Sequence, residues 1–127
     1  MANKRAQGFT LIEILVVLAI IATLLSLVTP RYFNTLDRSK EATLRHDLAA
    51  MRDAIDKFYS DNNVFPDTLE DLVQRKYVRA IPADPITESA ATWVFTPPSD
   101  IDAKGAIANI HSGSAELAAD GTPYASW

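Results

Sequence analysis

The sequence predicts an α+β fold in which one long N-terminal helix packs on a small antiparallel sheet. Two observations predict it. An apolar run over residues 9–29 leads into a stripe of apolar side chains at helical spacing that ends near residue 59. Further on, segments 92–96 and 106–111 are rich in residues that favour strands, and prolines and a glycine separate them. We expect a helix whose first half is apolar on all sides and whose second half is amphipathic and lies against the sheet.

The apolar run is long enough to span a membrane. Its 21 residues include 14 that are Phe, Leu, Ile or Val, and its one charge is Glu13. As a helix it would measure about 31 Å, the thickness of a bilayer core. The apolar side chains favour insertion by about 6 kcal/mol, which exceeds a cost of about 3 kcal/mol for one charge at mid-membrane. The run therefore predicts a single membrane-spanning helix.

The charges that flank the run predict its orientation. Lys4 and Arg5 precede it, and no charge follows it until Arg31. By the positive-inside rule the N-terminus stays in the cytoplasm and the residues after Pro30 cross the membrane. No small-x-small cleavage site precedes Pro30, which argues against an ordinary secretory signal. A generic membrane anchor stays open as an alternative, but it leaves the intramembrane carboxylate of Glu13 without a role.

A motif surrounds that carboxylate: Gly8-Phe9-Thr10-Leu11-Ile12-Glu13 follows a short basic leader and opens the apolar run. It resembles the prepilin motif of type IV pilins and type II secretion pseudopilins. The resemblance implies a pilin-like fold, cleavage between Gly8 and Phe9 by a membrane aspartic peptidase, and methylation of the new amine of Phe9. It also implies three parts: a leader peptide (1–8), a transmembrane and filament-core helix (9–29), and a periplasmic head that includes the amphipathic half of the helix (30–127).

The chemistry of this motif supplies a role for Glu13. After cleavage, the amine of Phe9 is a cation among apolar side chains, and Glu13 is an anion in the same surroundings. In neighbouring subunits the two charges would offset each other's desolvation cost and set the register of the packed helices. The competing hypothesis is an acid that extends towards the membrane surface without any partner.

The second half of the predicted helix carries an apolar stripe that we expect in the core. Charged residues lie between its members, Arg45 and Arg52 among them, and we expect these on the solvated face. Pro30 lies within the long helix and removes one backbone hydrogen bond, so a kink is expected there. The helix should end within residues 59–63, where polar turn formers follow. The stripe consists of Leu44, Leu48, Met51, Ile55 and Phe58.

Two further motifs indicate one group within this family. The first is Phe65-Pro66-x-Thr68-Leu69-Glu70-x-Leu72, in which Asp67 or Thr68 can cap a short helix. The second, later in the chain, is Ile81-Pro82-x-Asp84-Pro85. The pair resembles the G-type major pseudopilins of type II secretion systems.

The predicted sheet should bury four side chains against the helix, and Trp127 should anchor the end of the chain. The four are Trp93, Phe95, Ile107 and Ile110.

Resemblance to the G-type pseudopilins also implies a calcium-binding loop near the C-terminus, which in that family is usually longer and rich in acids. This chain keeps Asp120-Gly121 but lacks the acidic cluster. Calcium takes about six to eight oxygen ligands, and one acid with scattered carbonyls makes a poor site. We therefore expect no cofactor, and the weak calcium candidates are Asp100, Asp102, Glu116 and Asp120.

Composition and motif content exclude several classes of function. The formal net charge is −4, and removal of Lys4 and Arg5 with the leader takes it to −6, which argues against nucleic acid as a partner. The chain has no cysteine, whereas many type IV pilins close a C-terminal loop with a disulfide, so a pseudopilin is favoured. His46 and His111 show no metal-ligand spacing, and no glycine-rich phosphate loop is present. We expect no enzymatic activity.

The leading hypothesis is a structural subunit of the type II secretion pseudopilus, a periplasmic filament anchored in the bacterial inner membrane that drives protein export. Its expected partners are copies of itself, the prepilin peptidase, minor pseudopilins and the inner-membrane assembly platform. The alternative is a type IV pilin of a surface pilus that acts in adhesion, motility or DNA uptake. A membrane-anchored binding module that never polymerises is the third class.

Overall fold

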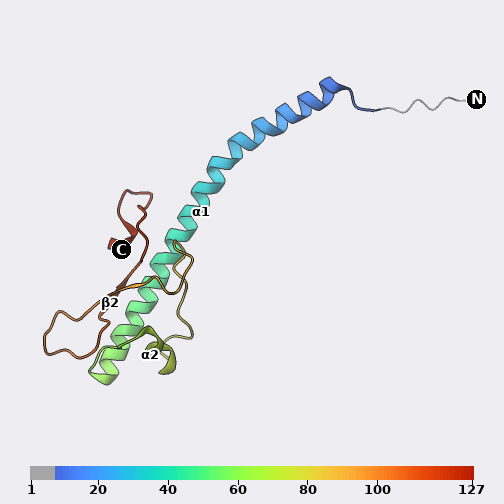
Figure 1. Ribbon diagram of the computed structural model, residues 1–127. Helices are drawn as coiled ribbons and strands as arrows, with labels where there is room; N and C mark the ends of the chain where they lie inside the picture. Colours follow the sequence, from blue (N-terminus) through green and yellow to red (C-terminus); the bar gives the residue numbers. More distant parts are fainter. Residues whose placement is uncertain (1–7) are drawn as a thin grey trace, which may run out of the picture. The chain divides into compact units, whose positions relative to one another are not determined.

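The computed structural model describes residues 8–127, so the leader charges Lys4 and Arg5 lie outside the described residues. The predicted α+β fold is confirmed (Figure 1). The chain divides into two compact units, Met1–Leu36 and Asp37–Trp127, and each is described by itself. The elements are α1 (Leu11–Asn62), α2 (Leu69–Gln74), β1 (Val94–Thr96), β2 (Asn109–His111) and a 3-10 turn, η1 (Tyr124–Ser126).

The first unit contains the apolar part of α1. Every residue from Gly8 to Leu36 is exposed on the single chain, and α1 is long and apolar enough to cross a membrane. Threonine hydroxyl groups bond within the helix: Thr23 and Thr29 each donate to the carbonyl four residues earlier, at 2.7 Å. Such internal bonds suit apolar surroundings, where no water can replace them. Pro30 lies within the helical span, and the kink at this position stays a prediction.

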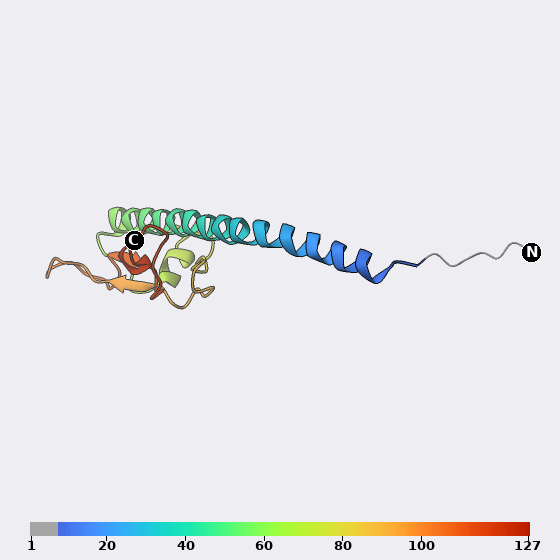
Figure 2. The ribbon, with the colours of Figure 1, turned by 90° about the horizontal axis from the view of Figure 1, so that it is seen from above.

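The second unit has a core built on the remainder of α1. In Figure 2, α2, the strands and the C-terminal segment lie along one side of this part of α1. The predicted stripe is confirmed, because each of its five members is at most 3% exposed. The core is completed by Ala54, Leu69, Leu72, Trp93, Ile107, Ile110, Ala118 and Tyr124.

Local signals explain where the helices begin and end. α1 stops before Asn63, whose φ of 57° is the left-handed conformation that commonly terminates helices. Of the two predicted caps for α2, Thr68 is the N-cap. Its backbone N–H donates to Asp71 Oδ2 at 3.1 Å, and the Asp71 N–H donates back to Thr68 Oγ1 at 3.3 Å. This reciprocal pair is a capping box, and it gives Asp71 a structural role.

The sheet has two antiparallel strands that are shorter than the predicted segments. Its register fixes which side chains share a face. The paired residues are Val94 with His111, Phe95 with Ile110, and Thr96 with Asn109.

Of the four side chains predicted to be buried in the sheet region, three are buried, and the prediction for Phe95 is wrong. Phe95 is 46% exposed, although its cross-strand partner Ile110 is fully buried. The reason is the position of β1: all three of its residues are exposed, whereas β2 receives hydrogen bonds from Arg52 of α1. β2 is thus the strand beside the helix, and β1 is the outer strand.

Candidate functional site

The Glu13 carboxylate lies in the first turn of α1 and bonds to its own chain. The backbone N–H of Thr10 donates to Glu13 Oε2 at 3.0 Å. The Glu13 N–H donates back to Thr10 Oγ1 at 3.2 Å, and the Ile14 N–H donates to the Thr10 carbonyl at 3.2 Å. Thr10 and Glu13 therefore form a capping box that closes the N-terminus of α1 just after Phe9.

This capping role is not among the roles predicted for Glu13 from the sequence. Its signal was present in the spacing Thr10-x-x-Glu13, which is the pattern of a capping box before an apolar run. The carboxylate accepts a hydrogen bond within its own chain, whereas its pairing with a neighbouring subunit, and the competing hypothesis of an acid without such a partner, stay predictions. The bond occupies only part of the carboxylate, since two oxygens offer about four acceptor positions.

The surroundings of Glu13 are apolar and open. A groove of about 510 Å³ runs along this face of the helix, and its lining contains one charged group, Glu13. Phe9 is 83% exposed at the start of the groove. Gly8 is exposed as well, and among residues 8–127, its own atoms and its chain neighbour aside, no atom lies within 4 Å of the place a Cβ would occupy. The groove is lined by Phe9, Ile12, Glu13, Val16 and Val17.

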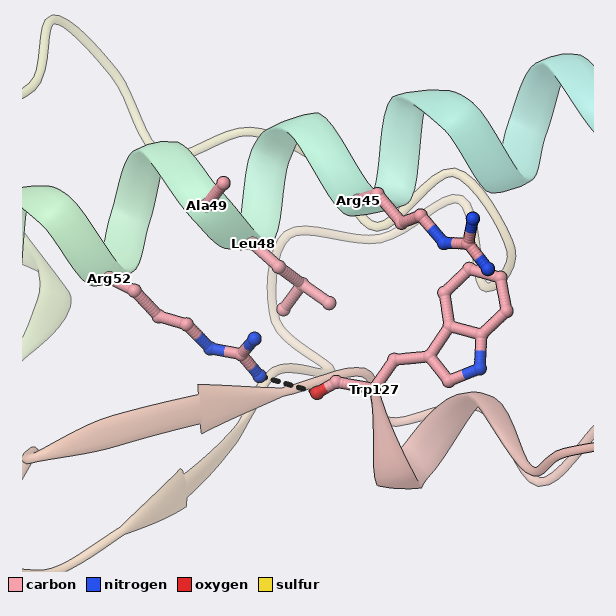
Figure 3. A pocket seen from close by; sticks show the side chains of 5 residues that line it. All are labelled: Arg45, Leu48, Ala49, Arg52 and Trp127. Carbon is pink, nitrogen blue, oxygen red and sulfur yellow. Dashed lines mark hydrogen bonds between the residues drawn. The ribbon is translucent and has the colours of Figure 1, made fainter.

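A second cluster of functional groups lies in the other unit, between α1 and the end of the chain. A hollow of about 240 Å³ is lined by Arg45, Leu48, Ala49, Arg52 and Trp127. In Figure 3, Arg45 and Arg52 lie on either side of Leu48, and Trp127 faces them. The Arg45 guanidinium lies 4.3 Å from the centroid of the Trp127 ring. The cluster contains no nucleophile and no acid, so it offers no catalytic set.

The prediction that Arg52 lies on the solvated face is wrong. Its side chain is half-buried and donates to Asn109 Oδ1 at 2.8 Å, to the Ile110 carbonyl at 2.9 Å and to the backbone oxygen of Trp127. Arg45 is exposed, but its guanidinium covers an indole ring. The two arginines therefore connect α1 to β2 and to the C-terminal segment.

The four calcium candidates occupy two different turns. Asp100 Oδ1 accepts the Asp102 N–H at 3.1 Å in the loop between the strands. Asp120 Oδ1 accepts the hydroxyl of Thr122 at 2.6 Å and its N–H at 3.0 Å, and these bonds lower the pKa of Asp120. Glu116 is exposed. Among residues 8–127, no three side chains of His, Cys, Asp or Glu are grouped so that they could hold a metal.

Comparison with known proteins places these features in a family context. A family model described as "Prokaryotic N-terminal methylation motif" matches residues 3–29. The type II secretion system core protein G of Escherichia coli (strain K12) is 33% identical, over 66% of this chain and 69% of the relative. The proteins of the same name from Aeromonas hydrophila and Pseudomonas aeruginosa are 31% and 33% identical, each over 67% of this chain and 71% of the relative. No solved structure matches the chain.

Proposed function

The chain belongs to the family of type II secretion system core protein G, the major pseudopilins, and on that premise we propose that its filament assembles through the Phe9–Glu13 segment. Members of this family are structural subunits of a pilin-like filament and not enzymes. The observation that carries the proposal is one carboxylate, Glu13, set in an exposed apolar helix directly after a Gly-Phe junction.

The first step of the proposal is maturation. A prepilin peptidase cuts between Gly8 and Phe9 and methylates the amine of Phe9. Two observations support it: the methylation-motif model covers this junction, and Gly8 is exposed ahead of the first turn of α1. Cutting there removes Lys4 and Arg5 but keeps the whole apolar helix.

The second step is pairing between subunits. The new amine of Phe9 lies against Glu13 of a neighbouring copy, so that neither charge stays alone among apolar side chains. Glu13 can accept a further hydrogen bond from that amine. Within residues 8–127 the Thr10 N–H bonds to Oε2 alone, and a carboxylate offers about four acceptor positions. The apolar surface from Phe9 to Thr29, which is exposed on the single chain, is covered by other helices in the filament or by lipid before assembly.

The third part of the proposal is location. The family assembles with the secretion machinery of the inner membrane and periplasm. We infer that the N-terminus faces the cytoplasm, that the head (30–127) lies in the periplasm, and that minor pseudopilins and the assembly platform are direct partners. Growth of the filament would then move folded substrates towards an outer-membrane channel. Family membership favours this role over that of a surface pilus.

The test has two measurements on cells that express the secretion system. Mass spectrometry of the purified protein should give a chain that begins at Phe9 and carries one extra methyl group. A photo-crosslinking amino acid at Val17, an exposed groove position, should give a ladder of homo-oligomers. The matched control, Gly8→Val, should block cleavage and abolish the ladder. A chain that keeps residues 1–8 and gives no ladder would refute the proposal.

A further inference from the structure

The C-terminal segment after β2 (residues 112–127) is bound to α1 by three charged side chains: Glu41, Arg45 and Arg52. Spacings of four and seven residues place them on one face of the helix. We call these three residues the latch. Glu41 contacts the middle of the C-terminal segment, and the two arginines contact its last residue, Trp127.

Glu41 holds the middle of the segment. Its Oε1 accepts the Ala119 N–H at 2.8 Å and the Tyr124 hydroxyl at 2.9 Å. Tyr124 is only 5% exposed, so its hydroxyl depends on this acceptor. Hydrogen bonds to a carboxylate are stronger than bonds between neutral groups.

Arg45 and Arg52 hold the end of the segment (Figure 3). The Arg45 guanidinium covers the Trp127 ring, and Arg52 donates to the Trp127 backbone oxygen. Trp127 in turn packs edge-on against Tyr124 with ring centroids 5.1 Å apart, and its indole N–H donates to Thr122 Oγ1 at 2.9 Å. Each latch residue therefore contacts Tyr124 or Trp127, two residues whose rings pack on each other.

The segment also closes on itself through backbone hydrogen bonds. The Ala118 N–H donates to the Thr122 carbonyl at 2.7 Å, and the Tyr124 N–H donates to the Glu116 carbonyl at 3.2 Å. Asp120 Oδ1 accepts two bonds from Thr122 inside this turn. The one acid of the turn is thus engaged by its own backbone and by a neighbouring hydroxyl.

Resemblance to the G-type pseudopilins implies a calcium ion in this region, and the residues present do not fit one. Calcium requires about six to eight oxygens at a common centre. The engaged Asp120 and the exposed Glu116 are the acids of the segment itself, whereas Asp100 and Asp102 belong to the loop between β1 and β2. Within the described part of the chain, no cluster of three such side chains forms. The carboxylate that does bind the segment, Glu41, already accepts two hydrogen bonds.

We propose that in this chain the latch residues Glu41, Arg45 and Arg52 hold the C-terminal segment in place of a metal ion. The head then reaches its folded state without calcium, and its stability is insensitive to chelators. The proposal concerns the single subunit, so it can fail while the proposed filament function holds.

The test uses the mature full-length chain in detergent micelles, with thermal unfolding followed by near-UV circular dichroism. The unfolding midpoint should be the same in calcium chloride and in the chelator EGTA. A midpoint that falls in EGTA, or that rises with added calcium, would overturn the proposal.

Two matched substitutions separate the latch from an ion site. Glu41→Ala should lower the midpoint by about 10 °C, because two charge-assisted hydrogen bonds are lost while alanine favours the helix. Glu116→Ala should change it by less than about 2 °C, since that side chain is exposed. An ion site built on the segment's own acids predicts the reverse order, and that order would contradict the latch.

A third variant tests the proposal even if the Glu41→Ala chain does not fold. Tyr124→Phe keeps the ring and removes only the hydroxyl that donates to Glu41. It should lower the midpoint by about 5 °C and speed limited proteolysis within residues 112–127, in calcium and in EGTA alike. If calcium restores the midpoint of this variant, an ion binds the segment and the proposal is wrong.

Discussion

Replacing Glu13 by glutamine separates the two roles of its carboxylate. Glutamine at this position still accepts the hydrogen bond from the Thr10 N–H, which is 3.0 Å long in the native chain, so the capping box survives. The negative charge is lost, however, and with it the proposed pair with the amine of Phe9 in a neighbouring subunit. Thr10→Ala does the opposite, because it removes the hydroxyl that accepts the Glu13 N–H at 3.2 Å and keeps the charge.

The two perturbations differ in size by a margin that an assembly assay can resolve. Removing one partner of an ion pair in apolar surroundings costs about 3 to 5 kcal/mol, which reduces an assembly equilibrium at least about 100-fold. Loss of a threonine N-cap costs about 1 kcal/mol, or roughly fivefold. We expect Glu13→Gln and Glu13→Ala to abolish filaments and Thr10→Ala to leave them weakened but present.

The assay is the homo-oligomer ladder obtained by photo-crosslinking at Val17 in cells. Mass spectrometry of each variant serves as the control, since all three chains must be cleaved before assembly is compared. If Glu13→Gln gives a normal ladder while Thr10→Ala and Glu13→Ala do not, then helix capping, and not intersubunit pairing, explains the acid. That result would refute the pairing step.

Three further predictions concern the second unit. Leu48→Ala, at a core position that is 2% exposed, should cost about 3 kcal/mol and lower the midpoint of thermal unfolding by more than about 10 °C. Burial and the bond to Glu41 raise the pKa of Tyr124 from 10.0 to about 12. Because the pKa of Tyr124 is higher in the folded state than in the unfolded state, its hydroxyl contributes fully to the stability of the head below about pH 10, and this contribution disappears as the pH rises towards 12. Urea unfolding across that pH range should show the loss. Gly113→Ala should destabilise the head by about 3 kcal/mol in the same assay, because a Cβ would lie 1.8 Å from the backbone oxygen of Thr92.

Each of these predictions has a matched control. Val94→Ala, at a position that is 51% exposed, should stay within about 0.5 kcal/mol of the native chain. Tyr124→Phe should lose the extra decline in stability between pH 10 and 12, because it lacks the hydroxyl whose pKa is raised. Gly121→Asn should cost less than Gly113→Ala, because no neighbouring atom lies within 4 Å of the added Cβ and asparagine adopts positive φ more readily than most residues, although a φ of 85° still strains it. Equal losses in a variant and its control would contradict the corresponding structural reason.

The features that the sequence predicted well are those set by local periodicity. Residues 44–58 repeat their apolar side chains at intervals of three and four, and this spacing is enough to identify the buried face of a helix. The end of α1 near Asn63 and the cap at Thr68 also follow from short polar signals. Such features need no knowledge of what the helix packs against.

The features that the sequence did not predict depend on contacts between distant segments. Alternation in residues 94–96 shows which side chains share a face, but not that β1 is the outer strand and leaves Phe95 exposed. Likewise, Arg52 has the spacing of a solvated residue, and its bonds to Asn109 and Trp127 exist only because the chain returns to α1 after more than 50 residues. The capping box at Glu13 is different, because the spacing Thr10-x-x-Glu13 that indicates it is local. The same carboxylate also carries a charge within a membrane-length apolar run, and the prediction used only that property.

The capping bond also explains how one carboxylate can serve before and after cleavage. In the uncut chain the nitrogen of Phe9 is an uncharged amide, and within residues 8–127 the hydrogen-bond donor to the Glu13 carboxylate is the N–H of Thr10. The capping box therefore gives the Glu13 carboxylate a hydrogen-bond donor, the Thr10 N–H, before cleavage. The proposed cleavage after Gly8 would change that amide into a charged amine and would leave α1, which begins at Leu11, in the mature chain, so the proposed attraction between subunits would begin only after processing. The peptidase step would thus act as the switch for assembly, and an uncut chain with an intact Glu13 should stay monomeric.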